Sequence, residues 1–173
     1  MSGATDRFVE AARARGLDPQ TRKFPQGTKT ATDAARAIGC EVGQIVKSLV
    51  FMADVTAVLA LTSGSNRVDE AKLAVAAGAE VARRATPEEA RSATGFAVGG
   101  TPPFGHPDRV PTFCDEDLLV FGEVWAAAGT PDSVFPLSPA DLVRLSDAAV
   151  VDLADRRAPR FPIRKLGSRD RRG

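Results

Sequence analysis

The chain has few of the side chains that carry out most enzyme chemistry. Its 173 residues include one histidine, two cysteines, one tryptophan and no tyrosine. A Cys/His zinc site needs three or four protein ligands, and the spacing of Cys40, His106 and Cys114 fits neither a zinc finger nor a zinc ribbon. A catalytic triad would have to use His106. The two separated cysteines argue against a disulfide framework and are typical of a reducing cytosol.

Long apolar runs are absent as well. The longest stretches, Val55–Leu61 and Leu118–Phe121, are far shorter than the ~20 residues that a membrane-spanning helix needs. The first ten residues are polar and charged, without the apolar region of a signal peptide. We therefore expect no membrane partner and a cytoplasmic location.

The formal net charge of +1 hides a strong asymmetry along the chain. Residues 156–173 contain eight basic residues and one acidic residue, a net charge of +7, which leaves −6 for residues 1–155. The length is that of one domain. We therefore expect a single domain over residues 1–155 and a basic, flexible tail over residues 156–173, which would bind a polyanion or merely aid solubility.

Hydrophobic periodicity and turn residues predict interspersed helices and strands, several of them joined by short turns. This pattern indicates an α/β or α+β domain with a mixed, curved sheet. The expected helices are 5–15, 30–38, 69–77, 86–94 and 139–145, with a helical turn at 42–46. The expected strands are 21–24, 47–52, 55–61, 80–84, 96–98, 110–114, 123–127, 133–137 and 148–153.

The segment Gly99-Gly100-Thr101-Pro102-Pro103 is the first candidate site. Two glycines permit positive φ and a close approach of backbone to a ligand, and the amides of Gly99, Gly100 and Thr101 could bind a carbonyl or a phosphate. Prolines follow where a dinucleotide-binding motif would begin a helix, so the segment is not such a motif. An ordinary strand-to-loop turn is the alternative.

Lys47 is the second candidate, because it stands at the start of the apolar strand Leu49-Val50-Phe51. A lysine there needs a charge partner or access to water. It could bind an anionic group such as a phosphate. Otherwise it simply extends its ammonium group into solvent at the sheet edge.

The remaining candidates have simple structural explanations. His106 titrates near neutrality and could be a general base, or else a hydrogen-bonding surface residue. Cys40 and Cys114 are expected to be packing residues. Asp115-Glu116-Asp117 could bind a cation or a substrate amine, but a strand end facing solvent also explains it.

Several short motifs, each weak alone, occur together in the order found in one known family. Their order and spacing resemble the YbaK/prolyl-tRNA synthetase-associated editing domain over about residues 20–153. The motifs are Gly27-Thr28-Lys29-Thr30-Ala31, Ala34-Ala35, Ile38-Gly39, Gln44–Phe51, Thr94-Gly95-Phe96, Val98-Gly99-Gly100, Pro103–His106, Asp115-Glu116, Ala128-Gly129 and Leu137–Leu142.

The resemblance implies a mixed, largely antiparallel, barrel-like sheet surrounded by helices, and hydrolysis of amino acids wrongly attached to tRNA, mainly tRNA(Pro). It implies that Lys47 is the essential lysine, near the 3′-terminal adenosine and its phosphate. It also implies that Gly99, Gly100 and Pro103 line the aminoacyl pocket. No metal or cofactor is expected. Water positioning and oxyanion stabilisation by loop amides would suffice for an activated ester.

One departure from the family pattern affects substrate choice. Thr101-Pro102 stands where the family often carries a bulky residue followed by serine or alanine. Hydroxyl partners from Thr30, Ser48 and Thr101 favour a small amino acid, namely alanine, serine, threonine or cysteine. His106 and Asp115 lie in family motifs and complete the expected substrate-binding set.

We expect a free-standing trans-editing protein, because no catalytic or anticodon-binding synthetase module is present. It would select its tRNA itself or work with an aminoacyl-tRNA synthetase. Two alternatives stay open. One is a non-catalytic module of the same fold that binds tRNA or a synthetase; the other is a different hydrolase that uses His106 and Cys114.

Overall fold

The computed structural model describes residues 3–24 and 30–157. The Gly27-Thr28-Lys29 part of the first motif and tail residues 158–173 lie outside this range. The described helices are α1 (Ala4–Ala14), α2 (Ala31–Ile38), η1 (Val42–Gln44), α3 (Glu70–Ala77), α4 (Pro87–Thr94), η2 (Glu116–Val120) and α5 (Pro139–Ser146). The strands are β1 (Arg22–Lys23), β2 (Val46–Ala53), β3 (Thr56–Ser63), β4 (Ala82–Arg84), β5 (Thr112–Asp115), β6 (Val124–Ala127), β7 (Ser133–Leu137) and β8 (Ala149–Val151).

The helices begin where a side chain can accept a hydrogen bond from a free amide of the first turn. The hydroxyls of Thr30, Thr86 and Ser138 do so for α2, α4 and α5, and the Asp69 carboxylate does so for α3. The helices α2, α3 and α4 each end at a glycine with positive φ. These local signals explain why the helix bounds predicted from the sequence agree closely with those of the structure.

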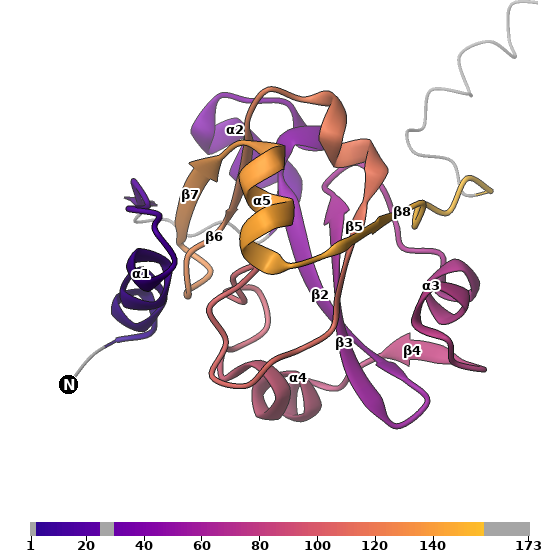
Figure 1. The fold of residues 1–173 in the computed structure, drawn as a ribbon. Coiled ribbons are helices and arrows are strands. Elements are labelled where there is room, and N and C mark those ends of the chain that lie inside the picture. The colour runs from indigo at the N-terminus through magenta and orange to yellow at the C-terminus, as the bar shows by residue number, and fades with distance from the viewer. Residues whose placement is uncertain (1–2, 25–29, 158–173) are drawn as a thin grey trace, which may run out of the picture.

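The strands form two sheets (Figure 1). The larger has the order β4-β2-β3-β5-β8 and the smaller the order β1-β7-β6. Strand β3 pairs in parallel with β5, and β5 with β8, whereas the other ladders are antiparallel. The mixed, largely antiparallel α/β fold is therefore confirmed.

The two sheets do not close into a barrel in the described part of the chain. A parallel bridge between Ile45 and Trp125 connects them where β2 begins beside β6. The barrel-like arrangement expected from the resemblance is thus an open one. The pocket described below lies at this junction.

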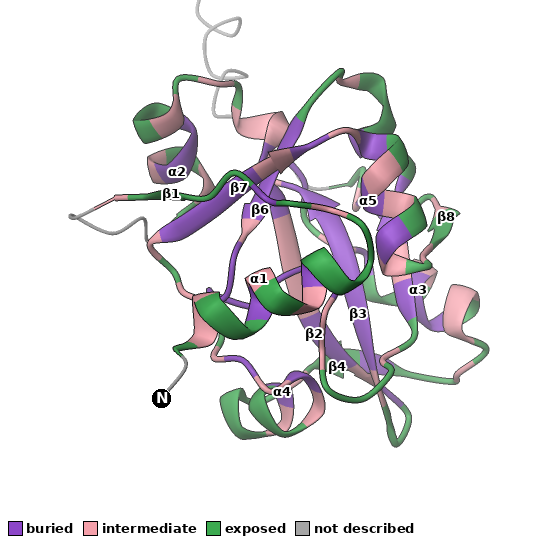
Figure 2. Cartoon of the chain, turned by 60° about the vertical axis from the view of Figure 1, so that its left-hand side comes forward, coloured by how far each residue is buried: buried purple, intermediate pink, exposed green. Residues whose placement is uncertain are grey.

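Helix α1 covers one side of the main core. Phe8 is fully buried, and its ring lies 5.4 Å from that of Phe104 and 4.8 Å from that of Phe135, measured between centroids. Figures 1 and 2 show α1 beside β6 and β7, with exposed residues on its outer face. The helix therefore joins the small sheet to the loop that contains Phe104.

Two local expectations are wrong. Residues 96–98 are irregular and do not form a strand. The Thr94 hydroxyl accepts a hydrogen bond from the Phe96 amide at 3.1 Å, and the Gly100 amide donates to the Ala97 carbonyl. The β2–β3 turn is Asp54-Val55 and not Ala53-Asp54, since Ala53 still pairs with Thr56. Asp54 adopts a φ of 55°, which aspartate tolerates. No helix within residues 3–24 and 30–157 is long and apolar enough to cross a bilayer.

Candidate functional site

A pocket of about 500 Å³ lies where the two sheets meet, a size typical of small-molecule sites. It is bounded by the start of α2, the first half of β2, the end of β4, the loop before Thr101, and strands β6 and β7. Its lining includes Thr30, Ala31, Ala34, Lys47, Ser48, Arg84, Val98, Gly99, Thr101, Trp125, Ala126, Ala127 and Pro131. Five of the nine sequence-predicted site residues are thus brought together.

Lys47 lies on β2, opposite Thr62 of β3, and is partly buried. Its Nζ donates a hydrogen bond of 2.7 Å to the main-chain carbonyl oxygen of Asn66. Burial lowers the pKa of Lys47, and the positive charges of Arg84 and Arg67 lower it further. A cation that already has unfavourable neighbours gains from an anion placed beside it.

Ser48, the next residue on β2, offers a hydroxyl that its own chain does not use. Its Oγ is buried and has no hydrogen-bond partner in the described structure. An unsatisfied buried hydroxyl is costly unless something pairs with it. Because Ser48 lines the pocket, a polar group of a ligand can supply that partner.

The glycine loop forms another wall of the pocket. Gly99 has a φ of 91°, and a Cβ built on it would lie 3.6 Å from Cγ of Pro131. The amide of Gly100 is already used in a turn, where it donates to the carbonyl of Ala97. Within the described chain, the amides of Gly99 and Thr101 have no such acceptor. These two amides are therefore the candidate donors to a ligand.

Thr30 lies at the pocket, but its hydroxyl is engaged. Its Oγ1 accepts a hydrogen bond of 3.0 Å from the Asp33 amide, as the N-cap of α2. Thr101 is buried, and its hydroxyl donates to the Ala97 carbonyl. The Thr30 hydroxyl can therefore still donate its proton to a ligand, whereas the Thr101 hydroxyl, which already donates, can only accept.

Gly100, Pro103, His106 and Asp115 are not brought to the pocket lining. Pro103 is buried within the loop segment itself. His106 Nε2 lies 2.8 Å from the carbonyl oxygen of Pro102, and its ring packs edge-on against Phe96. Burial lowers the pKa of His106, which favours the neutral form of the ring. The geometry indicates a support for the loop.

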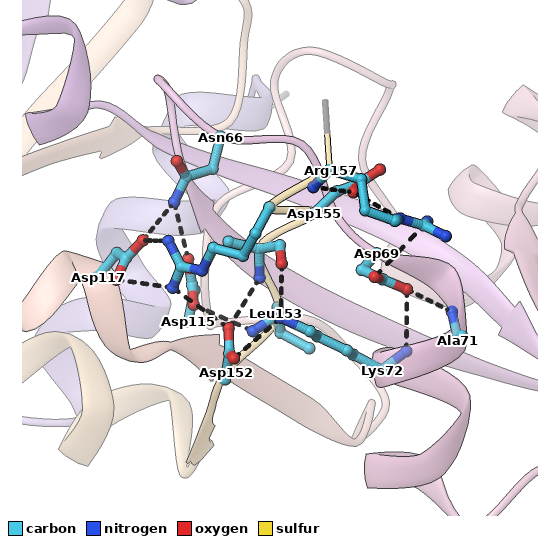
Figure 3. A network of polar contacts seen from close by, with 12 residues as sticks. Asn66, Asp69, Ala71, Lys72, Asp115, Asp117, Asp152, Leu153, Asp155 and Arg157 are labelled. Atoms are coloured by element: carbon cyan, nitrogen blue, oxygen red, sulfur yellow. Dashed lines mark hydrogen bonds and ion pairs between the residues drawn. The ribbon is translucent and has the colours of Figure 1, made fainter. Parts of the chain in front are cut away.

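Asp115 is fully buried, so the expectation of a solvent-facing strand end is wrong for this residue. Its Oδ1 accepts a hydrogen bond from the Leu153 amide and its Oδ2 accepts one from the Asn66 side chain (Figure 3). The carboxylate is retained inside the protein because it satisfies these two donors.

Cys114 is fully buried next to Asp115, and burial raises its pKa to about 12. The thiolate is the nucleophilic form, so a thiol with this pKa is unreactive at neutral pH. Cys40 also has a raised pKa because of burial. These findings argue against a hydrolase that uses Cys114 and His106. In the described part of the chain, no three His, Cys, Asp or Glu residues are grouped to hold a metal ion.

Arg84, Trp125 and Pro131 are among the pocket residues that sequence reasoning did not assign to the site. Arg84 is the last residue of β4, a strand that the alternation of residues 80–84 predicts, but its place beside the pocket depends on the β2–β4 pairing. The guanidinium group of Arg22 lies over the ring of Trp125, 5.3 Å from the ring centroid. In the sequence, the presence of a single tryptophan was the one signal that could have pointed to an aromatic surface in the pocket.

Comparison with known families gives a match over most of the chain. The profile described as "Aminoacyl-tRNA editing domain" matches residues 25–145. A solved structure described as that of "a putative trans-editing enzyme for prolyl tRNA synthetase" is 47% identical and superimposes with a TM-score of 0.84. It covers 90% of this chain and 99% of that one.

Two curated relatives extend the comparison. The Proline--tRNA ligase of Solidesulfovibrio magneticus is 34% identical over 82% of this chain, but the chain spans only 24% of that ligase. The "Putative Cys-tRNA(Pro)/Cys-tRNA(Cys) deacylase EbsC" of Enterococcus faecalis is 26% identical over 72% of this chain and 76% of its own length. The chain is therefore similar both to a segment of a ligase and to a protein of comparable size.

Proposed function

Because the chain belongs to the aminoacyl-tRNA editing domain family, we propose that it is a trans-acting deacylase. It hydrolyses the ester that joins a small, wrongly attached amino acid to the 3′ end of tRNA(Pro). The observation that carries this proposal is the pocket. One cavity is lined by Lys47, which is partly buried, and by Gly99 and Thr101, whose amides have no main-chain acceptor in the described chain.

The proposed mechanism uses positioning and electrostatics. Lys47 binds a phosphate of the terminal nucleotides as a point charge, which fixes the ester in the pocket. The Gly99 and Thr101 amides stabilise the oxyanion that forms when water attacks the ester carbonyl. The terminal ribose oxygen then leaves and takes up the proton that the attacking water gives up, so that free amino acid and tRNA are released. Gly100 shapes the loop and does not donate.

The lining supports a small amino acid. Ala31, Ala34, Ala126 and Ala127 leave space for a short side chain but offer no charge to a long one. The unpartnered Ser48 hydroxyl favours a substrate that carries its own hydroxyl or thiol, because a site that hydrogen-bonds such a group discriminates well. Serine, threonine, cysteine and alanine are the candidates.

The test is a panel of tRNA(Pro) charged with each of these four amino acids. We expect ester hydrolysis of at least one, and a loss of about 100-fold or more in Lys47→Ala because the phosphate contact is gone. Lys72→Ala is the matched control, since Lys72 is bound in an ion pair with Asp152. Ser48→Ala should lower the preference for the hydroxylated esters relative to alanine.

Full activity of Lys47→Ala, or no hydrolysis of any of the four esters, would overturn the proposal. Retention of the tRNA without turnover would instead support the non-catalytic binding module. The proposed partners are the acceptor end of the mischarged tRNA and a synthetase that produces it, which would place the reaction in the cytoplasm.

A further inference from the structure

The hydrogen-bond acceptor of the Lys47 ammonium is a main-chain atom. Nζ donates at 2.7 Å to the carbonyl oxygen of Asn66, a residue only 5% exposed that follows β3. A main-chain carbonyl in a loop can hold a side chain in place only if the loop itself is fixed. The position of Lys47 therefore depends on what holds Asn66.

The side chain of Asn66 is held at two points. Its Nδ2 donates to Oδ2 of Asp115 at 3.1 Å and to Oδ2 of Asp117 at 2.8 Å, which uses both amide hydrogens. Figure 3 shows Asn66 directed toward these two carboxylates, which come from the end of β5 and the start of η2. The loop after β3 is thereby attached to a different part of the sheet.

The two carboxylates are themselves fixed by the chain after β8. Asp115 is fully buried, and its other oxygen accepts from the Leu153 amide at 3.1 Å. Asp117 receives two hydrogen bonds from the guanidinium of Arg156, at 3.0 and 3.3 Å. Arg156, assigned to the tail by the sequence, therefore lies against the domain.

These contacts form a continuous path from Arg156 to the lysine. Arg156 holds Asp117, Asp117 and Asp115 hold the Asn66 side chain, and the Asn66 carbonyl holds Lys47 Nζ. Every step in the path is a charge-assisted hydrogen bond, the stronger and more directional kind.

We propose that Asn66 is a positioning residue that orients the Lys47 ammonium toward the pocket, and that Asp115, Asp117 and Arg156 hold Asn66 in place. The role rests on the proposed function of Lys47. It assigns the buried carboxylate of Asp115 to the support of the site, since Asp115 does not line the pocket.

The first experiment exchanges the two ends of one hydrogen bond. Asn66→Asp replaces the donor by a carboxylate that faces Asp115 and Asp117, and we expect kcat for deacylation to fall about tenfold with KM nearly unchanged. The double variant Asn66→Asp, Asp115→Asn restores a donor–acceptor pair of opposite direction. It should recover at least half of the lost kcat, whereas an unchanged kcat in folded Asn66→Asp would contradict the proposal.

The second experiment compares two adjacent arginines, which also keeps the proposal testable if Asn66→Asp does not fold. Arg157 forms ion pairs with Asp155 and Asp69, so Arg157→Ala removes the same charge without touching the path to Lys47. Arg156→Ala should lower kcat two- to threefold, and Arg156→Lys should restore it partly. Equal kcat in the two alanine variants would overturn the role of Arg156.

A third readout does not depend on activity. In the substrate-free protein, the ¹⁵N-labelled ammonium of Lys47 should exchange its protons with water several-fold faster in Asn66→Asp than in the wild type, while Lys72 is unaffected. The same exchange rate in both proteins would contradict the positioning role. If Lys47→Ala retained full deacylase activity, the proposed function would fail, but this measurement would still decide whether Asn66 holds the lysine.

Discussion

Gly100 and Thr130 lie so close that a Cβ built on Gly100 would come within 2.7 Å of Thr130 Cα and 2.8 Å of the Gly129 oxygen. The glycine loop and the turn before β7 therefore fit together backbone to backbone. This contact sets the distance between two walls of the pocket, since Gly99 and Pro131 on either side both line it.

Gly100→Ala should consequently force the loop and the turn apart. We expect a loss of about 1–3 kcal/mol in the free energy of unfolding, together with lower deacylase activity. Gly122→Ala is the matched control, because nothing lies within 4 Å of its added Cβ. It should stay within about 0.5 kcal/mol of the wild type. Urea unfolding measures both, and equal stabilities would refute the close packing.

Two buried threonines should respond in opposite ways to replacement by valine. The hydroxyl of Thr62 has no partner, so Thr62→Val should be neutral or stabilise by up to about 1 kcal/mol. The hydroxyl of Thr94 donates to Ala90 and accepts from the Phe96 amide. Thr94→Val should cost about 1–3 kcal/mol, because it leaves that amide unpaired. Thermal unfolding of the pair tests this difference in sign.

The lowered pKa of Lys47 predicts how stability depends on pH. Between the folded-state pKa and the ordinary value of 10.5, the unfolded chain keeps a proton that the folded protein has released. The free energy of unfolding should therefore rise with pH across this window. In Lys47→Met this rise should disappear, and stability at pH 7 should increase. Lys23→Met, at an exposed position, should keep the rise.

Arg84 should affect the pH dependence of the reaction through Lys47. Its charge is the second cause of the lowered Lys47 pKa, after burial. Arg84→Gln should raise that pKa and move the alkaline limb of the kcat/KM profile to higher pH. Arg83→Gln is the control, because Arg83 is paired with Glu89 at 2.9 Å. The rate of spontaneous ester hydrolysis must be subtracted at each pH. If the alkaline limb of the kcat/KM profile does not move in Arg84→Gln, activity does not depend on protonated Lys47.

Phe8→Ala tests the attachment of α1. The ring is fully buried between Phe104 and Phe135, and its removal should cost about 3–5 kcal/mol. Arg13→Ala on the same helix removes only an exposed ion pair with Asp18 and should change little. Calorimetry of both variants measures this, and a small cost for Phe8→Ala would mean that α1 is loosely attached.

The features that sequence reasoning predicted well are those set by neighbouring residues. Thr86-Pro87 and Ser138-Pro139 begin helices because a hydroxyl followed by proline satisfies and shapes the first turn. The fold class followed from the same local signals. Lys47, Ser48 and Gly99 were placed in one site by the family resemblance, and the structure groups them in one pocket.

The features that sequence reasoning missed depend on contacts between residues that are far apart in the sequence. Asp115 was expected either at a solvent-facing strand end or in the substrate site, because nothing near it in sequence shows that Asn66, 49 residues away, would bind it inside the protein. Phe96 looked like part of a strand, although the Thr94 hydroxyl uses the amide that a strand would need. The Gly100 amide was expected to face a ligand, but a turn takes it up.

The contact between α1 and Gly129 limits how the pocket can be transplanted. A Cβ on Gly129 would lie 2.7 Å from the Ala4 carbonyl oxygen, so the first turn of α1 supports the turn that faces Gly100. Residues 4–14 and β8 both lie outside the segment 25–145 that matches the family profile. A graft of that shared segment alone into another protein would leave one pocket wall and the Asp115 carboxylate without their supports, so the portable unit is residues 3–157.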